Sequence, residues 1–170
     1  MLKVGEKPPA FRELDLSGCG TRSLALELFR YEFLTALNVS HNKLTSIPAA
    51  IQRLTLLTYL DASSNKITAI PKMIYKCTRL QQLILSQNLI TTLPAEIALM
   101  SELAELLLEE NPLQEPFATL KNKGTIQIAG YLRDNSRGLT LSDPSLFPHP
   151  HPHTLSRQNL LPSLQRNESG

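Results

Sequence analysis

The sequence predicts an α/β repeat solenoid, with short parallel strands on a concave face and helical or irregular return segments on a convex face. One observation is a set of leucines that recur every 23 residues: Leu34, Leu57, Leu80 and Leu103. A second is a set of asparagines with the same period: Asn42, Asn65, Asn88 and Asn111. A fixed period of this length indicates stacked copies of one supersecondary unit, which bury a core only together.

Each copy is predicted to begin with a strand. In the copy that starts at Leu34, the apolar residues Leu37 and Val39 alternate with polar residues, so one side of the chain is apolar. The second half of the copy spaces its apolar residues by three and four, as in Leu44, Ile47 and Ile51. This spacing predicts a helical or near-helical return segment. Prolines stand where these segments begin, at a position where a missing N–H costs little: Pro48, Pro71 and Pro94.

The asparagine column is predicted to be structural. A turn that leaves a buried strand exposes backbone N–H and C=O groups that need partners, and a side-chain amide both donates and accepts. Stacked amides are therefore expected to form a ladder between copies. The predicted ladder consists of Cys19, Asn42, Asn65, Asn88 and Asn111, with Cys19 in a degenerate first copy.

The period divides the chain into four parts. Residues 1–10 are a predicted lead-in or cap, 11–116 hold five copies, 117–134 form a helical cap, and 135–170 form a Pro- and His-containing tail that is predicted to be disordered. The cap is expected to contain a helix over 117–122 that ends at Gly124 and a second over 126–134 with Thr125 as its N-cap. The side chains expected to cover the last copy are Ile126, Ile128, Ala129 and Leu132.

Composition excludes several classes of partner. The formal net charge of +2 is too small to predict a nucleic-acid or anionic-membrane partner. No apolar run approaches the roughly 18 residues of a membrane span, and Met1–Ala10 has no hydrophobic secretion segment. Cys19 and Cys77 are predicted to be buried thiols without a disulfide. A reducing compartment is expected, the cytoplasm first and the nucleus as the alternative.

The region of about residues 11–134 resembles the intracellular leucine-rich repeats with Leu-Pro-x-x-Ile return segments, such as Shoc-type Ras-pathway scaffolds and plant intracellular Ras-group-related proteins. A second resemblance, in residues 11–18 and in the repeat count, is to the repeat segment of the large deadenylase subunit of the Ccr–Not complex. There the repeats precede a nuclease domain. Nothing after Asp134 is long or apolar enough to be one. This resemblance therefore implies only the non-catalytic part.

Outward-pointing residues of the strands and the turns after them form columns that contain no lysine or arginine. Acidic residues gather at both ends of the columns and a partly apolar region lies between, which predicts a groove for a protein with a basic or mixed-charge surface. The alternative interpretation is a solvated sheet with small polar side chains. The predicted partner-binding residues are Glu13, Asp15, Asn38, His41, Tyr59, Asp61, Gln82, Ile84, Glu105, Leu107, Glu109 and Glu110.

The sequence therefore predicts a monomeric, non-enzymatic scaffold or regulatory adaptor for signal transduction, with no cofactor, metal, nucleic acid or membrane partner. The first alternative is the non-catalytic module of a Ccr–Not-type deadenylase assembly, and the second is an enzyme of an unrecognised kind. The histidines of residues 149–153 alternate with proline, and no cysteine or carboxylate completes a metal-binding set. Ser40 and His41 are adjacent but form no catalytic triad.

Overall fold

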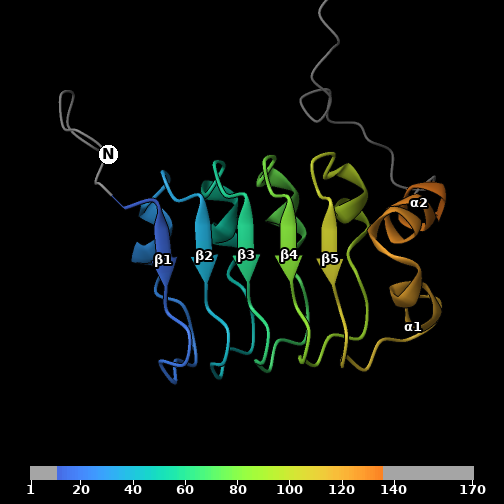
Figure 1. Cartoon of the computed structure of the whole chain (residues 1–170), viewed down its shortest axis with the longest axis horizontal. Helices are drawn as coiled ribbons and strands as arrows, with labels where there is room; N and C mark the ends of the chain where they lie inside the picture. Colours follow the sequence, from blue (N-terminus) through green and yellow to red (C-terminus); the bar gives the residue numbers. More distant parts are fainter. Residues whose placement is uncertain (1–10, 136–170) are drawn as a thin grey trace, which may run out of the picture. The chain divides into compact units, whose positions relative to one another are not determined.

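The structure, a computed structural model, describes residues 11–135, which form a parallel sheet of five strands in the order β1-β2-β3-β4-β5 (Figure 1). The strands are β1 (Glu13–Asp15), β2 (Ala36–Asn38), β3 (Tyr59–Asp61), β4 (Gln82–Ile84) and β5 (Glu105–Leu107). Equivalent residues of successive repeats pair directly, as Leu37 does with Leu60. The lead-in over residues 1–10 and the tail from residue 136, with its histidines, lie outside the described residues.

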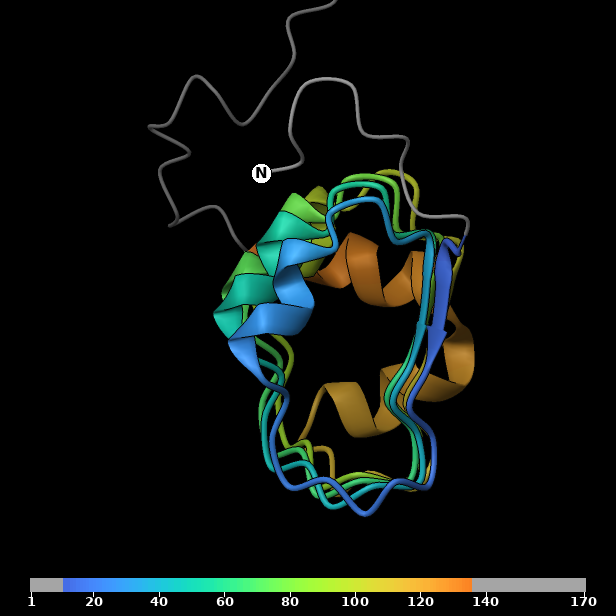
Figure 2. The same ribbon diagram turned by 90° about the vertical axis from the view of Figure 1, so that its left-hand side faces the viewer.

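Four short 3₁₀ helices lie on the side of the core opposite the strands (Figure 2). They are η1 (Leu26–Arg30), η2 (Ala49–Arg53), η3 (Lys72–Lys76) and η4 (Ala95–Leu99). Pro48, Pro71 and Pro94 are the N-cap residues of η2, η3 and η4, where the sequence placed them. Their backbone hydrogen bonds join residues three positions apart. In η2, for example, the N–H of Ile51 donates to the Pro48 carbonyl at 3.0 Å. Helices of this tighter kind usually occur as short connectors. The predicted α/β repeat solenoid is confirmed.

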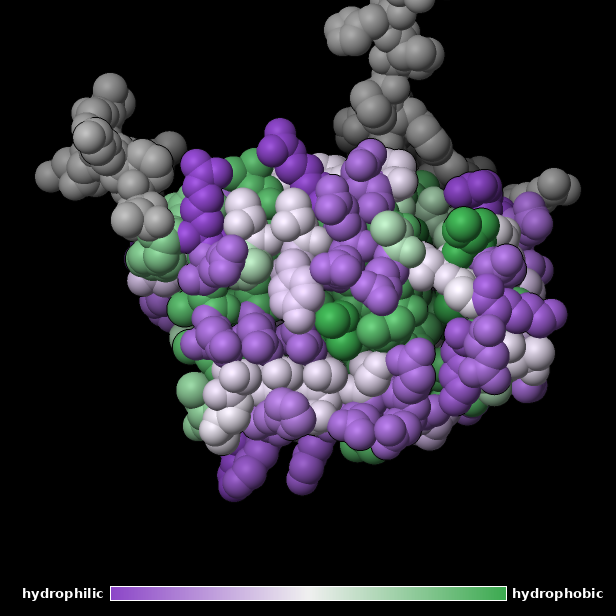
Figure 3. Space-filling model, viewed as in Figure 1, coloured by the Kyte–Doolittle hydropathy of each residue, from purple (hydrophilic) through white to green (hydrophobic). Residues whose placement is uncertain are grey.

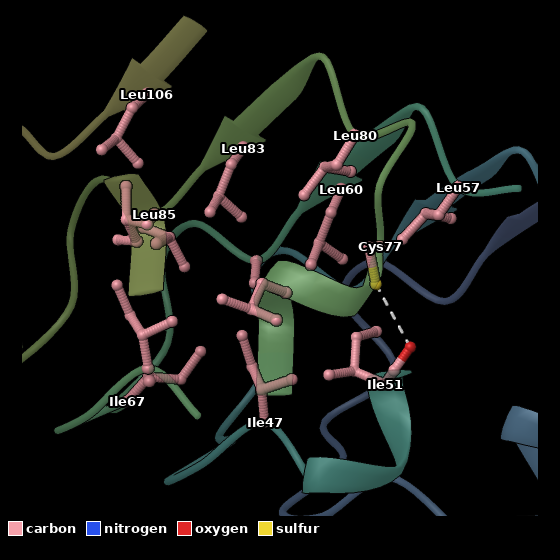
Figure 4. Close-up of a cluster of buried hydrophobic side chains, with 14 of the residues drawn as sticks. Ile47, Ile51, Leu57, Leu60, Ile67, Cys77, Leu80, Leu83, Leu85 and Leu106 are labelled. Carbon is pink, nitrogen blue, oxygen red and sulfur yellow. Dashed lines mark hydrogen bonds between the residues drawn. The ribbon is translucent and has the colours of Figure 1, made fainter. Parts of the chain in front are cut away.

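The core fills the space between the sheet and the 3₁₀ helices (Figure 4). Leu60 and Leu83 point into it from the strands, and Ile51 enters it from η2, all of them almost fully buried. Cys77 lies in the same core and its thiol donates to the Ile51 carbonyl at 3.3 Å. Burial raises the pKa of the Cys77 thiol to about 12, so this cysteine acts as a small apolar side chain.

Asparagine side chains join each turn to its neighbour. The Asn65 amide nitrogen donates to the Val39 carbonyl of the preceding repeat at 3.0 Å and to the Ala62 carbonyl of its own repeat at 3.1 Å. The Asn65 amide oxygen accepts from the N–H of Leu44 at 2.9 Å. Each of these groups is buried, so an amide replaces the water that the turn excludes. The same pattern of bonds is made by Asn42, Asn88 and Asn111.

The prediction for Cys19 is wrong. Cys19 is exposed, and its thiol lies 3.6 Å from the Ser17 carbonyl of its own repeat. In the described sheet no strand lies before β1, so a side chain at this position has no preceding turn to bridge. Cys19 therefore is neither a ladder residue nor a buried thiol.

Two α-helices and a 3₁₀ turn follow the last repeat: α1 (Phe117–Leu120), η5 (Lys121–Lys123) and α2 (Thr125–Asn135). Ile128 and Leu132 of α2 are buried in the core. The prediction that Ile126 also covers the last repeat is wrong, because its side chain is 82% exposed. Residues 125, 128 and 132 share one helical face by their spacing, and residue 126 points about 100° away from it.

Thr125 completes the outer edge of β5. The N–H of Glu105 donates to Gln81 on the β4 side, so the next N–H, that of Leu106, faces the edge where the described sheet ends. The Thr125 hydroxyl accepts from the Leu106 N–H at 2.8 Å, and Thr125 itself is buried. A side chain from α2 thus supplies the acceptor that the next strand would have supplied. The prediction of Thr125 as the N-cap is wrong, because Thr125 is the first residue of α2 and its hydroxyl bonds to β5.

We expect Asn65→Ala to lower the free energy of unfolding by about 1–3 kcal/mol, because the buried Leu44 N–H loses its acceptor. The Val39 and Ala62 carbonyls each lose one of two amide donors and keep the bond from Asn42 or Asn88. Denaturant titration would measure the loss. Cys19→Ala is the matched control, since it removes an exposed side chain from the same column and should change stability by less than about 0.5 kcal/mol. Equal effects of the two substitutions would contradict the ladder role.

Thr125→Val keeps the shape of the side chain and removes the acceptor for the Leu106 N–H. We expect a loss of about 1–3 kcal/mol in the free energy of unfolding. Thr125→Ser keeps the hydroxyl and is expected to lose much less. Thermal unfolding of the pair measures the difference, and equal stability of the valine and serine variants would show that the bond is dispensable.

Candidate functional site

The candidate site is the sheet face, defined as the outward-pointing residues of the five strands and the turns that follow them. Figure 3 views this face directly and shows polar residues over its edges and an apolar patch over β4 and β5. Tyr59, Asp61, Ile84, Glu105 and Leu107 are half-buried in the face, while Glu13, Asp15 and Gln82 are exposed. The strands therefore bring the predicted partner-binding residues onto one surface.

Polar residues at the ends of the first three strands bond within their own turns. The carboxylate of Asp15 accepts from the Ser17 N–H at 2.8 Å, and the Asp61 carboxylate accepts from the Ser63 N–H at 2.9 Å. Asn38 makes the equivalent bond to Ser40. A turn in which an Asp or Asn side chain accepts from the backbone N–H two residues later is an Asx turn. The sequence carried the signal as Asp or Asn two residues before Ser, but the prediction treated these residues only as partner contacts.

The bonds from Ser17 to Asp15 have an electrostatic consequence. They hold the pKa of the Asp15 carboxyl below its ordinary value of 3.8, first through the Ser17 backbone N–H and then through the Ser17 side chain. A carboxyl with a lowered pKa contributes stability at pH values above the unfolded pKa and loses it as the pH falls through the folded pKa. Asp15 is therefore charged at neutral pH.

The turn after each strand contains a residue in the left-handed backbone region. His41, Ser64, Gln87 and Glu110 have φ values of 54°, 52°, 58° and 54°. Gly18 occupies the same column of the first repeat with φ 65°, and glycine takes this region without strain. Gly18 is the one sequence feature that could have indicated a left-handed residue in this column, which the repeat pattern did not predict. The conformation directs the side chains of His41 and Glu110 away from the buried side of the turn, and both are exposed.

Hydrogen bonds between repeats order the side chains over β4 and β5. The Gln82 amide donates to the Glu105 carboxylate at 2.8 Å, and the Ser86 hydroxyl donates to the Glu109 carboxylate at 2.6 Å. Farther along the turn, the Gln87 amide lies 3.2 Å from both oxygens of Glu110. The apolar residues Ile84 and Leu107 pair directly in the strand register between the first two of these bonds.

Tyr59 lies at the centre of the face on β3. Its hydroxyl is 3.5 Å from the Asp61 carboxylate, at the long limit of a hydrogen bond. Partial burial raises the pKa of the Tyr59 hydroxyl above its ordinary value of 10.0, and the negative charge of Asp61 raises it further. The ring is thus a neutral, half-buried aromatic surface in an otherwise acidic neighbourhood.

Several basic side chains lie away from the sheet face. Arg30, Arg53 and Lys76 are in the last turns of η1, η2 and η3, on the side of the core opposite the sheet. Within residues 11–135 the ion pair found is Lys72 with Glu96, at 3.9 Å, and it joins η3 to η4 rather than crossing the sheet face. Carboxylates on the sheet face are therefore balanced by polar donors and solvent.

The site is an open face rather than an enclosed pocket. A hollow of about 530 Å³ does occur where the chain enters β3, β4 and β5, but its lining shares no residue with the predicted partner-binding set. It is lined by Thr58, Thr78, Arg79, Gln81, Ser101 and Glu102. Within the described residues, no three His, Cys, Asp or Glu side chains are arranged to hold a metal ion. The helices among those residues are too short or too polar to cross a membrane.

Comparisons with known families and proteins match the repeats. A family model described as "Leucine rich repeat" matches residues 9–67, and a two-copy leucine-rich-repeat model matches residues 55–105. Among curated proteins, the Schizosaccharomyces pombe CCR4-Not complex 3'-5'-exoribonuclease subunit Ccr4 is 46% identical over 41 residues. That match covers 24% of this chain and 6% of the exoribonuclease subunit.

Two solved structures extend the comparison to the fold. A leucine-rich-repeat protein of Leptospira interrogans superposes with a TM-score of 0.57 at 36% identity, over 60% of this chain and 26% of the other. The BIR3–SERK2 complex of Arabidopsis thaliana contains a chain with a TM-score of 0.55 at 32% identity, over 59% of this chain and 56% of that one.

We expect Asp61→Asn to lower the pKa of the Tyr59 hydroxyl, because the substitution removes a negative charge while burial remains. The absorbance of tyrosinate, followed against pH, measures the change, and the difference between each protein and its Tyr59→Phe derivative isolates Tyr59 from the other tyrosines. In the parent the folded-state pKa is raised, so this group's stability is fully present below pH 10.0 and is lost as the pH rises through the folded pKa. An unchanged pKa in the Asp61→Asn protein would contradict the assigned contact.

Proposed function

The chain belongs to the leucine-rich-repeat proteins, and from this we propose that it is a non-enzymatic module that binds a protein partner across its sheet face. The observation that carries the proposal is the separation of charge between surfaces. The sheet face bears Glu13, Asp15, Asp61, Glu105, Glu109 and Glu110, while the η helices carry bases such as Arg53. Such separation steers a basic or mixed-charge protein to one side of the molecule.

The geometry of the face also favours a protein partner over a small substrate. The candidate residues lie on an open surface that crosses five strands, and the hollow beside it contains none of them. Tyr59, Ile84 and Leu107 are half-buried apolar side chains at the centre, with carboxylates around them. A central aromatic or aliphatic anchor with a polar rim is the usual arrangement of a protein interface.

The proposed role is that of a scaffold or regulatory adaptor in the cytoplasm or nucleus, acting as a monomer. Both cysteines are free thiols, and Cys19 is exposed, which suits a reducing compartment. The BIR3–SERK2 structure is a complex of two proteins, one of them similar to this chain. It supports protein binding as the general activity, while the role in signalling is part of the proposal.

A second candidate function is the non-catalytic leucine-rich-repeat module of a Ccr–Not-type deadenylase assembly. The favouring observation is the 46% identity over 41 residues to the Schizosaccharomyces pombe subunit. Affinity purification of the tagged chain from its native lysate, followed by mass spectrometry, separates the two candidates. Recovery of Ccr–Not subunits favours the assembly, and recovery of signalling proteins without those subunits favours the scaffold.

We expect Tyr59→Ala to raise the dissociation rate of the recovered partner, with a loss of about 2 kcal/mol if the ring is an anchor. Reversal of Glu109 and Glu110 to lysine should mainly slow association and weaken its dependence on salt, because both carboxylates are exposed. Surface plasmon resonance at several salt concentrations measures both rates. A combined Lys72→Ala, Lys76→Ala and Arg79→Ala variant is the control, which should bind as the parent does. If the control alone fails to bind, the working surface is the one opposite the sheet.

A further inference from the structure

The part of the sheet face over β4 and β5 has a more specific geometry. Ile84 and Leu107 pair in neighbouring strands and form a continuous apolar surface. The Gln82–Glu105 bond lies on one side of this apolar pair and the Ser86–Glu109 bond lies on the other. Two carboxylates therefore frame one apolar pair, an arrangement that Figure 3 shows as a hydrophobic patch between polar regions.

These carboxylates are oriented before any partner arrives. Glu105 accepts from Gln82 at 2.8 Å, and Glu109 accepts from Ser86 at 2.6 Å, each bond joining neighbouring repeats. Each of these bonds uses one oxygen of its carboxylate. A side chain that is already ordered loses less conformational freedom on binding, which favours affinity.

The spacing of the three features matches an extended peptide. Residues 105, 107 and 109 point outward from the same stretch of chain, and alternate residues of extended chain are about 6.7 Å apart. A second extended chain laid along β5 presents its own alternate side chains with the same spacing. A base, an apolar residue and a base at positions i, i+2 and i+4 would then meet Glu105, the Ile84–Leu107 pair and Glu109 in order.

We propose that this surface, here named the framed patch (Gln82, Ile84, Ser86, Glu105, Leu107 and Glu109), binds an extended protein segment of the form base-x-apolar-x-base. The inference rests on the proposed function and specifies the partner's chemistry at one part of the sheet face. Lysine or arginine suits both basic positions of the segment, because its aliphatic stem can pack on the apolar pair while its charged end reaches a carboxylate. Phosphate backbones and anionic lipid surfaces are repelled by the same carboxylates.

The repeats themselves supply substitutions that the fold accepts. Leu107→Asn places at the β5 position the residue that Asn38 already occupies in β2. Glu105→Gln copies Gln82, and Glu109→Ser copies Ser86, from the same columns of the preceding repeat. Glu102→Gln, which changes an exposed residue at the separate hollow, is the matched control.

The test titrates the whole chain, labelled with ¹⁵N, with the peptide acetyl-Gly-Lys-Ser-Leu-Ser-Lys-Gly-amide and follows the backbone amide signals. One control peptide moves the leucine by one position, which turns it to the opposite side of the extended chain, and another replaces both lysines with glutamate. We expect saturable binding with shifts centred on β4 and β5, and binding at least about tenfold weaker for either control peptide. Leu107→Asn and the combined Glu105→Gln and Glu109→Ser variant should weaken binding to a similar degree, and Glu102→Gln should not.

Three results would overturn the framed patch. They are no saturable binding at a peptide concentration of about 1 mM, equal binding of the register-shifted peptide, and shifts centred away from β4 and β5. The proposed function is judged separately with the recovered partner. If Tyr59→Ala weakens that partner while Leu107→Asn does not, the sheet face still binds protein and the framed patch is wrong. If only the lysine and arginine variant on the opposite side weakens it, both proposals are wrong.

Discussion

The structure depends on one constraint, that the backbone groups buried in a turn must find partners, and some of these partners lie in a neighbouring repeat. A single asparagine per repeat meets most of this requirement. Asn88, for example, donates to the Ala62 carbonyl of the preceding repeat and accepts from the Ile67 N–H of that repeat. Because the amide spans two copies, no repeat satisfies its own turn, and the copies are stable only as a stack. The core leucines could be exchanged for other apolar residues, but the amide geometry could not.

The same constraint explains why the two ends of the described sheet differ. At β1 there is no preceding turn to bridge, and the column holds an exposed cysteine, Cys19. At β5 there is no following strand, and the free N–H of Leu106 needs an acceptor. The Thr125 hydroxyl provides it from α2, while Ile128 of the same helix covers the apolar side. Within residues 11–135, the β5 end obtains its partner from a different kind of secondary structure, and no ladder bond is found at Cys19 at the β1 end.

The period predicted the fold well, because a fixed spacing assigns each residue to a column and each column to one side of a strand. Leu60, Ile74 and Asn65 lie where the pattern placed them. The pattern could not predict contacts that depend on backbone conformation or on a broken period. It gave no left-handed turn for Gln87, no Asx turn for Asp61 and the wrong exposure for Ile126. A column shows which residues are neighbours, but it does not show whether a polar side chain bonds to a neighbour, to its own turn or to solvent.

That last distinction changes how the sheet face should be understood. In the first three repeats the polar residue that ends each strand bonds to its own turn, as Asp15 does, and is partly occupied by a structural task. In the last two repeats Ile84 and Leu107 occupy the column, and the acids beside them bond across repeats instead. The asparagine ladder fixes the backbone in both halves, which leaves the outward columns free to differ. The face is therefore divided into a polar half that supports its own turns and an apolar half whose carboxylates are held by bonds between repeats.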